Sequence, residues 1–526
     1  MRLREWLLGL ASRLGHRPAV LRRETAVARS LDFVEIQNNE ATAAVASIED
    51  AAACDERADA LVIGLLARVM RRRGTIATAL DYVRSLARDT RANCWELAER
   101  AGHGLPYRMQ GLLGKSRWRW EDLRDLLPGL AQDVLGGDPG DGIGPGLAID
   151  ETADLRKGNS TACVAPQHAG VTGKIENCVT WVFSALVTAS GQAWADFDAY
   201  MPDCWAKDQG RREKAGIPEG LSFATKPELA IAQVRRLVAG GLRVLWAAAD
   251  EVYGRSGEFR AALRGLGLSY VVIIPCDYQV TFARNKVTRA DQAVSEAVFE
   301  QRSAGNGTKG PRYADWALLG TKDPRELLLI RRLPDRGKNQ YTYYLCHAAE
   351  GRPATLTYFI TIAGSRWPAE TTFRTGKDAF GWDQSQARTW NAICRHTALT
   401  ALAQLRTAAA RAALTGCRVL PAAAPAVPGT APVPEEPAVN PDDLQIHTGD
   451  APLPATGGLP CPPGIPPITL SHAETSKITR LARDWKQGLL TRARLAFHLR
   501  WSAWRRRHQA RARWHHYSAR LAALAR

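Results

Sequence analysis

The alternation of short apolar runs with a helical segment between residues 146 and 274 is the feature that most constrains the fold. The apolar runs have the length of strands and cover residues 147–150, 179–187, 244–250 and 270–274. Before the third run, residues 227–237 carry apolar side chains at helical spacing and end at Gly240-Gly241. Strands interleaved with helices predict an α/β sheet of mixed direction.

Two of these runs end in an aspartate, Asp150 or Asp250, and a third acid, Glu370, lies in a segment predicted to be helical. At about 100° per residue, Glu370 stands roughly 40° round that helix from Arg366 and roughly 20° from Lys377. A guanidinium, a carboxylate and an ammonium therefore share one helix face. Acids from two strand ends and a helix, with cations beside one of them, suit a metal-dependent phosphodiester site.

The residues that follow the two aspartates are also acids, Glu151 and Glu251. Neighbouring side chains on a strand face opposite sides, so we expect both glutamates to point away from Asp150 and Asp250. The simpler interpretation of a single acid at a strand end is a turn or N-cap residue.

Asp378 and Asp383 are alternative candidates for the third acid. Asp378 stands roughly 80° from Glu370 on the predicted helix and is therefore less well aimed. Pro368 falls early in the same helix, and if Ser365 caps the helix, the missing N–H of the proline lies in the first turn, where it costs little.

Composition divides the 526 residues into regions of different character. The expected regions are a helical N-terminal region that binds DNA at 1–140, an α/β catalytic region at 141–418 with a β-rich insertion at about 276–355, a linker at 419–468 and a tail at 469–526. The linker carries about half of the 29 prolines, so we expect it to be disordered. The tail holds 14 Lys and Arg against 2 acids, a charge of +12 out of a total of +17.

A net charge of +17 favours a polyanionic partner such as nucleic acid. Within the N-terminal region, residues 95–102 and 108–113 are separated by Pro106 and predict either a helix-turn-helix DNA reader or an ordinary helical hairpin. The ten cysteines include no C-x-x-C pair, and no apolar stretch approaches the ~20 residues of a membrane span. We therefore expect a cytoplasmic protein without a membrane partner.

Several motifs, taken in their order along the chain, resemble those of the DDE transposases of bacterial insertion sequences. They are Ala-Ile-Asp-Glu-Thr at 148–152, Gly-Lys-Ile-Glu-Asn-Cys at 173–178, Phe-Ala-Thr-Lys-Pro-Glu-Leu at 223–229, Ala-Asp-Glu-Val-Tyr-Gly at 249–254, and Arg-x3-Glu-x6-Lys at 366, 370 and 377. The last motif is similar to the branch with a Tyr-x2-Arg-x3-Glu-x6-Lys signature. The resemblance covers residues from about 65 to 415 and again near 485–520.

The resemblance implies an RNase H-like catalytic core with a β-rich insertion before the glutamate. It implies cleavage at the ends of an insertion sequence and transfer of the 3′-hydroxyls into target DNA. Asp150, Asp250 and Glu370 would hold two Mg²⁺ ions, for which Mn²⁺ can substitute, and Arg366 and Lys377 would contact DNA phosphate. The implied partners are double-stranded DNA with terminal inverted repeats, target DNA and a second copy of the chain, in the nucleoid of a bacterial cytoplasm.

Further residues are candidates for DNA contacts. They are Lys174 and Lys226 for phosphates, Trp316 for stacking on a flipped base, and Trp504, Arg505, Arg506 and Arg507 of the tail for phosphate binding and stacking. The simpler interpretations are solvated lysines, a core tryptophan and a basic amphipathic helix that packs on another surface.

One position departs from the family pattern, because Ala363 stands where the signature has tyrosine, three residues before Arg366. This motivates an alternative, a catalytically impaired or domesticated transposase that acts as a DNA-binding protein. A glycosidase with a pair of carboxylates is a third possibility, but it needs one acid kept protonated. The cations beside Glu370 disfavour it, since they lower the pKa of a carboxylate.

Overall fold

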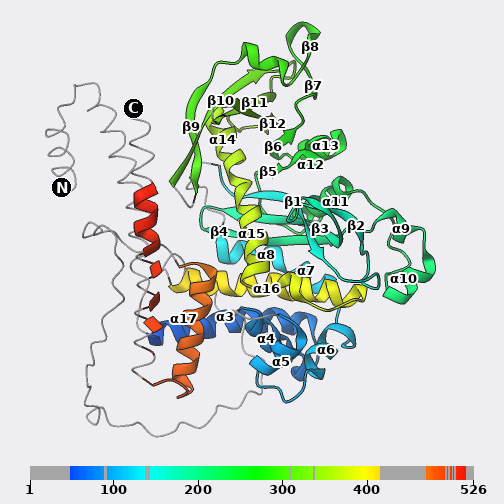
Figure 1. Ribbon diagram of the computed structural model, residues 1–526, viewed down its shortest axis with the longest axis vertical. Helices are drawn as coiled ribbons and strands as arrows, with labels where there is room; N and C mark the ends of the chain where they lie inside the picture. Colours follow the sequence, from blue (N-terminus) through cyan, green and yellow to red (C-terminus); the bar gives the residue numbers. More distant parts are fainter. Residues whose placement is uncertain are drawn as a thin grey trace, which may run out of the picture.

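The computed structural model describes residues 48–87, 92–136, 143–307, 310–335, 338–414 and 470–516, the last with gaps at 492–494, 496–497, 500, 503–504 and 507. Figure 1 shows a large sheet with helices packed beside it and a layer of helices beneath. The expected mixed α/β class is confirmed. The predictions for residues 419–468 and for the first 47 residues concern positions outside the described part of the chain.

The centre of the sheet is formed by five strands in the order β4-β3-β1-β5-β6. They are β1 (Gly146–Leu155), β3 (Lys174–Thr188), β4 (Gly191–Ala199), β5 (Trp246–Ala249) and β6 (Ser269–Ile274). Strands β4, β3 and β1 pair antiparallel, whereas β5 and β6 run parallel to β1. This is the topology of an RNase H-like core, as the resemblance implied.

Strand β1 is longer than its apolar run predicts. The run ends at Asp150, but β3 pairs with all ten residues of β1, from Gly146 to Leu155. The prediction that Asp150 ends a strand was therefore wrong, because pairing with a long neighbour extends a strand through polar residues. Strand β4 was not predicted at all, and β2 (Ala165–Ala169) pairs with the beginning of β3.

Helix α11 (Lys226–Ala239) connects the antiparallel and parallel parts of the sheet and packs on β3 and β4. It ends at Gly240 as predicted. The other helices that flank these strands are α9 (Asp203–Ala206), α10 (Gln209–Ala215), α12 (Glu251–Gly254) and α13 (Gly257–Gly265).

The β-rich segment after β6 continues the sheet and is not a separate module. Its strands are β7 (Gln279–Thr281), β8 (Val287–Arg289), β9 (Glu300–Gly307), β10 (Gly310–Gly320), β11 (Glu326–Asp335) and β12 (Lys338–His347), with 3₁₀ turns η2 (Ala283–Asn285) and η3 (Gln292–Glu296). β12 pairs antiparallel with β6, placing Tyr343 opposite Ile274, and β11, β10 and β9 follow outward. The sheet has ten strands in the described part of the chain, and β7 and β8 form a small sheet of their own.

Two consecutive helices return the chain from the outer strands to the core. They are α14 (Leu356–Ser365) and α15 (Trp367–Asp378), followed by the 3₁₀ turn η4 (Trp382–Gln384). α14 packs closely on β9, since a Cβ on Gly364 would lie 2.2 Å from the carbonyl oxygen of Ala304. The insertion therefore supports α14, the helix that directly precedes the one that carries Glu370.

The helical layer is built around α16 (Trp390–Leu414), which is buried along most of its length. A helix buried on all sides lies between two other layers. Here these are β4 and α8 (Leu127–Leu135) on one side and the earlier N-terminal helices, among them α3 (Ile48–Val69) and α4 (Arg73–Leu86), on the other (Figure 1). The N-terminal helices are α3 (Ile48–Val69), α4 (Arg73–Leu86), α5 (Cys94–Arg100), α6 (Tyr107–Gly114), α7 (Trp120–Arg124) and α8 (Leu127–Leu135). In the described residues, no helix has the length and apolarity needed to cross a bilayer.

Helix α17 (His472–Lys486) of the tail packs on α3 and α16. A cluster of ion pairs joins the three helices, and Arg406 of α16 is at its centre. The Arg406 guanidinium lies 2.6 Å from both Asp55 and Asp59 of α3. Arg483 of α17 also pairs with Asp55, and Arg84 of α4 pairs with Asp59. We call these five residues the α3–α16–α17 ion cluster.

Candidate catalytic centre

Asp150 and Asp250 lie at the same edge of the sheet because β1 and β5 are parallel neighbours. The two strands pair only as far as Ile149 and Ala249, the residues that directly precede the aspartates. Beyond this point β1 continues as a strand, whereas the backbone after β5 turns into α12, with Asp250 as the N-cap of that helix. The Asp250 carboxylate accepts a hydrogen bond of 3.0 Å from the Val252 N–H, which fixes its orientation.

Glu151 belongs to the same group of carboxylates, contrary to the expectation that it points away. Ligand oxygens of Asp150, Glu151 and Asp250 all lie within 4.8 Å of one another. Alternation fixes only the direction of each Cβ along β1, whereas the carboxylate of the longer glutamate side chain is placed by its donors, the Lys226 ammonium and the Tyr253 hydroxyl. Glu251, in contrast, has a side chain that is 45% exposed and pairs with Arg255 at 2.6 Å, and it does not belong to the group.

Arg366 connects the third acid to this edge of the sheet. It stands at the junction of α14 and α15 and donates hydrogen bonds of 3.0 Å to Asp150 and 2.9 Å to Glu370. The expected proximity of Arg366 and Glu370 on one helix face is confirmed. Pro368 does lie in the first turn of α15, but Ser365 does not cap the helix, since its hydroxyl donates to the Thr361 carbonyl of α14.

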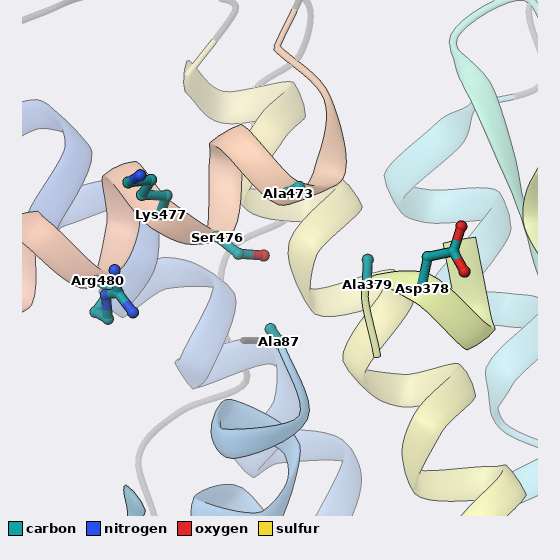
Figure 2. A pocket seen from close by; sticks show the side chains of 7 residues that line it. All are labelled: Ala87, Asp378, Ala379, Ala473, Ser476, Lys477 and Arg480. Atoms are coloured by element: carbon teal, nitrogen blue, oxygen red, sulfur yellow. The ribbon is translucent and has the colours of Figure 1, made fainter. Parts of the chain in front are cut away.

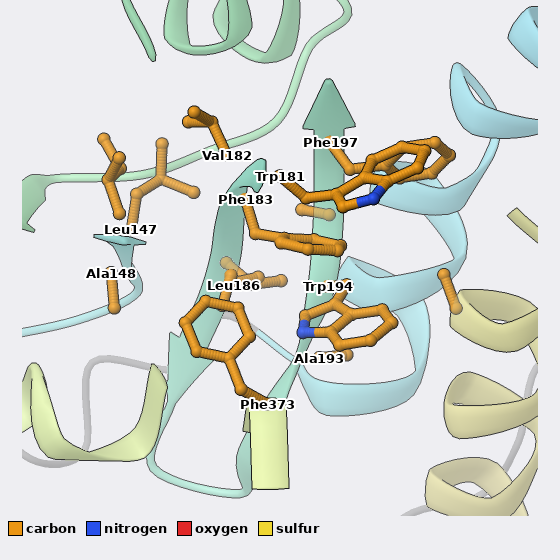
Figure 3. Packing of buried hydrophobic residues seen from close by; sticks show 14 of the residues in the cluster. Leu147, Ala148, Trp181, Val182, Phe183, Leu186, Ala193, Trp194, Phe197 and Phe373 are labelled. Carbon is orange, nitrogen blue, oxygen red and sulfur yellow. The ribbon is translucent and has the colours of Figure 1, made fainter. Parts of the chain in front are cut away.

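An aromatic cluster holds helix α15 against the sheet. Phe373, one turn after Glu370, packs on Phe183 of β3 and Trp194 of β4, with ring centroids 5.4 and 6.4 Å apart (Figure 3). All three rings are buried. Aromatic pairs at these distances contribute about 0.5–1.5 kcal/mol each beyond their buried area, so the position of Glu370 is set by core packing.

The two aspartates have raised pKa values. Burial raises the pKa of Asp150 to about 7, with Arg366 opposing the shift and the Asp250 charge adding to it. Burial likewise raises the pKa of Asp250 to about 6, and the Glu151 charge adds to that shift. Three crowded carboxylates of this kind fit a divalent cation, which neutralises their repulsion and prefers oxygen ligands.

We expect divalent-metal affinity to rise steeply with pH, because metal and protons compete for Asp150 and Asp250. Both carboxyl groups are largely protonated at pH ~5.5 and largely ionised at pH ~7.5, so Mn²⁺ affinity measured by calorimetry should increase more than about tenfold over this range. In metal-free protein the same raised pKa values make the stability fall as pH rises from ~4 to ~7. Equal affinities at the two pH values would contradict the assignment, and Asp150→Asn with Asp250→Asn should flatten the profile.

Sequence profiles of two families match this chain. They are the DDE superfamily endonuclease, over residues 65–315, and the transposase DDE domain, over residues 228–405. A protein of Microchaete diplosiphon described as "Probable transposase for insertion sequence element IS701" is 32% identical over 298 residues, which cover 55% of this chain and 70% of that protein. The chain belongs to the DDE transposases.

The transposase also aligns with a solved piggyBac transposase synaptic complex with hairpin DNA, over 70% of this chain and 74% of that one. The TM-score is 0.32 and the sequence identity 12%, a likeness that carries no argument. The first family profile spans Asp150 and Asp250, and the second spans Asp250 and Glu370. Together the matches therefore cover Asp150 and Asp250 at the sheet edge and Glu370, which Arg366 links to Asp150.

Lys377 of the transposase is bound to its own strand β1. Its ammonium donates a 2.9 Å hydrogen bond to the Ala153 carbonyl and lies 5.8 Å from the centre of the Trp382 ring. Burial lowers the pKa of Lys377. The residue thus ties α15 to β1 in this structure, and its contact with DNA phosphate stays a prediction.

The alternative third acids lie elsewhere. Asp378 is exposed at the far end of α15, beside a cavity of about 120 Å³ (Figure 2). The residues around the cavity come from α15, α17 and the end of α4: Ala87, Asp378, Ala379, Ala473, Ser476, Lys477 and Arg480. Asp383 lies in η4, where its charge acts on Asp154 and Lys377. Glu370 is therefore the best placed of the three.

The residues predicted to contact DNA outside the centre, Lys174, Lys226 and Trp316, differ in exposure and in their partners. Lys226 forms a 2.6 Å ion pair with Glu151, while Lys174 is exposed at the start of β3. Trp316 is 1% exposed and packs on Tyr344, with ring centroids 6.0 Å apart. A base could not stack on the Trp316 ring in this conformation, because its faces are covered.

Of the four tail residues predicted to contact DNA, the structure describes Arg505 and Arg506. Arg505 pairs at 2.6 Å with Glu474 of α17, and Arg506 is buried. Trp504 and Arg507 lie outside the described residues. The part of the tail that the structure describes therefore uses one of its predicted DNA-binding arginines for internal packing on α17.

Two residues near the centre were missed by sequence reasoning. Glu151 is one, and Arg312 of β10 is the other. The Arg312 guanidinium donates to the carbonyl of Gly364 at 2.9 Å and to that of Ala304, joining the insertion to α14. The Glu370 charge reaches the same guanidinium, although burial lowers its pKa overall. No local signal identifies Arg312, since its position follows from the pairing of distant strands.

Proposed function

We propose that this transposase cuts DNA at the ends of an insertion sequence and joins the freed 3′-hydroxyls to target DNA. In the first reaction water replaces the 3′-oxygen on a phosphorus atom, and in the second a 3′-oxygen replaces one on the target strand. Each reaction exchanges one phosphorus–oxygen bond for another. The observation that carries the proposal is the meeting of Asp150 and Asp250 at one sheet edge, with Glu370 joined to it by Arg366.

The carboxylates of Asp150, Asp250 and Glu370 would hold the divalent ions, which we propose to be two Mg²⁺. When bound, such ions activate the attacking oxygen and stabilise the leaving oxygen. The chain keeps its acids in position by three means: strand pairing for Asp150, the helix N-cap for Asp250 and aromatic packing for the helix of Glu370.

Arg366 supplies positive charge beside the reacting phosphate. A guanidinium has five N–H donors in a planar fork that suits both carboxylates and phosphate oxygens. In this structure two donors of Arg366 face Asp150 and Glu370. We propose that the guanidinium binds a phosphate oxygen once DNA enters, while it keeps Glu370 turned toward Asp150.

We propose that the helical region at 1–140 and the tail at 469–526 contact the terminal inverted repeats. Exposed aromatic and basic side chains on the N-terminal helices support this: Trp95 and Tyr107 are more than half exposed, and Arg108 and Arg71 are exposed as well. Such side chains suit phosphate contacts and stacking. A homodimer on paired ends follows from the need to cut two ends together.

The proposal is tested with the full-length protein and linear DNA that carries the sequences flanking its gene. We expect cleavage in Mg²⁺ or Mn²⁺, no cleavage in EDTA, and loss of cleavage in Asp150→Ala, Asp250→Ala and Glu370→Ala. The matched control is Asp378→Ala, an acid on the same helix as Glu370, which should cut like the parent. DNA binding without metal-dependent cleavage would contradict the proposal and favour an impaired transposase, and so would unchanged cutting by the three alanine variants.

A further inference from the structure

The carboxylate of Glu151 is held between the two catalytic aspartates by two donors from different helices. Its Oε1 accepts from the Lys226 ammonium at 2.6 Å, and its Oε2 accepts from the Tyr253 hydroxyl at 2.9 Å. Both oxygens are thus engaged, one by each partner. Since its ligand atoms lie within 4.8 Å of those of Asp150 and Asp250, Glu151 adds negative charge to the centre without being one of the three acids of the family motif.

Lys226 occupies a position that local helix preferences oppose. It is the first residue of α11, after the N-cap Thr225, whose side chain forms a capping box with Glu228. Cations at a helix N-terminus are disfavoured by the helix dipole by about 0.3–1 kcal/mol, and acids are preferred there. The ammonium turns instead to Glu151, with their side chains only 25% and 20% exposed. A residue that violates a local rule and is paired across the fold points to a role beyond helix stability.

Tyr253 links Glu151 to the segment that carries Asp250. Its ring is fully buried in α12, three residues after Asp250, and its hydroxyl is directed at Glu151 of β1. Helix α12 itself is fixed against β6, because a Cβ on Gly254 would lie 1.8 Å from the carbonyl oxygen of Ile273. Glu151 therefore connects three segments that surround the centre: β1, α11 and α12.

We propose that Glu151 is a positioning residue of the metal centre, one that orients Asp250 through Tyr253 and, with Lys226 as its counter-ion, increases the attraction of the site for divalent cations. This inference rests on the proposed function. Partners of this kind, which contact the ligands and not the ion, typically change metal affinity 10–100-fold when they are replaced. The two donors hold the Glu151 carboxylate in place beside its neighbours.

The test measures Mn²⁺ binding to the full-length protein without DNA, by isothermal titration calorimetry. Glu151→Gln keeps the shape and removes the charge, and we expect it to weaken Mn²⁺ binding by about 10–100-fold. The matched control is Glu251→Gln, because Glu251 also directly follows a catalytic aspartate but pairs with exposed Arg255. The control should bind Mn²⁺ like the parent protein. Asp250→Asn serves as the reference for the Mn²⁺ affinity that remains when the metal centre is disrupted.

Tyr253→Phe supplies a second variant, since it removes only the hydroxyl and keeps the buried ring. We expect a smaller loss of affinity than in Glu151→Gln, and a combined loss smaller than the sum of the two, because the Tyr253 hydroxyl acts through the side chain at position 151. If the two changes acted independently through the structure, their losses of Mn²⁺ affinity would simply add. Thermal unfolding of each variant checks that the protein is folded. If Glu151→Gln does not fold, unchanged Mn²⁺ affinity in Tyr253→Phe overturns the proposal.

The possible failures are distinguishable. Mn²⁺ binding that depends on Asp250 but is unchanged in Glu151→Gln contradicts the positioning role alone and leaves the proposed function intact. Binding that does not depend on Asp250 contradicts the metal centre and the positioning role together. Equal losses in Glu151→Gln and Glu251→Gln also overturn the inference, because any nearby negative charge would then suffice.

Discussion

Replacing Asp250 with asparagine should abolish DNA cleavage and at the same time stabilise the metal-free protein. Loss of a metal ligand removes several kcal/mol of transition-state stabilisation, which corresponds to a rate reduction on the order of 10³-fold or more. The gain in stability has a different origin. Burial raises the pKa of Asp250 to about 6, so the ionised carboxylate is a cost to the folded state above that pH.

The sign of the stability change follows from the raised pKa. The contribution of a protonated Asp250 is present below the ordinary pKa of an aspartate and is lost as pH rises through about 6. Asparagine never ionises and is an equally good N-cap, so at pH ~7.5 we expect a gain of about 1–2 kcal/mol in the free energy of unfolding. Cleavage assays and thermal unfolding in EDTA measure the two effects. Cleavage within tenfold of the parent, or a lower unfolding midpoint, would contradict this account.

Replacing Arg406 with methionine should lower the free energy of unfolding by about 3–5 kcal/mol, the usual cost of breaking a buried ion pair from one side. Arg406 is 4% exposed and lies 2.6 Å from both Asp55 and Asp59, which are buried as well. Methionine fills a similar volume but leaves the two carboxylates with less compensation. The unfolding midpoint, followed by calorimetry or circular dichroism, should fall by several degrees.

Arg483→Met is a graded control for this prediction. Arg483 pairs with the same Asp55, but its side chain is 21% exposed, so water can replace the lost contact in part. We expect a loss of about 1 kcal/mol or less. If Arg406→Met destabilised the protein no more than Arg483→Met, the α3–α16–α17 ion cluster would not be the stabilising element that its burial indicates.

Of the five central strands, β1, β3, β5 and β6 were predictable from their apolar runs, whereas β4 was not. The apolar runs predicted a sheet of mixed direction but not that β1 and β5 are parallel neighbours, and helical spacing placed Arg366 beside Glu370. The full length of β1 was not predictable in this way, since residues 151–155 become a strand through pairing with β3. Strand pairing is set by packing between distant segments, and a single sequence contains little local information about it.

The direction of Glu151 shows where a local rule fails. Alternation along a strand fixes where each Cβ points, but the carboxylate of a glutamate lies beyond Cβ and Cγ and can turn toward distant partners. The Lys226 ammonium and the Tyr253 hydroxyl then hold the Glu151 carboxylate toward the centre, although they lie 75 and 102 residues away in sequence. The partners of Asp55 are still farther apart, with Arg406 and Arg483 separated from it by 351 and 428 residues.

The contacts of α17 have a consequence for how the chain is held together. Residues on either side of the 415–469 segment meet in one apolar cluster, which includes Leu414, Leu470 and Ile478, and the ion cluster lies beside it. The tail is therefore attached to the rest of the protein by a non-covalent interface as well as by the peptide backbone. We expect that two polypeptides divided within this segment would assemble through this interface as a split protein.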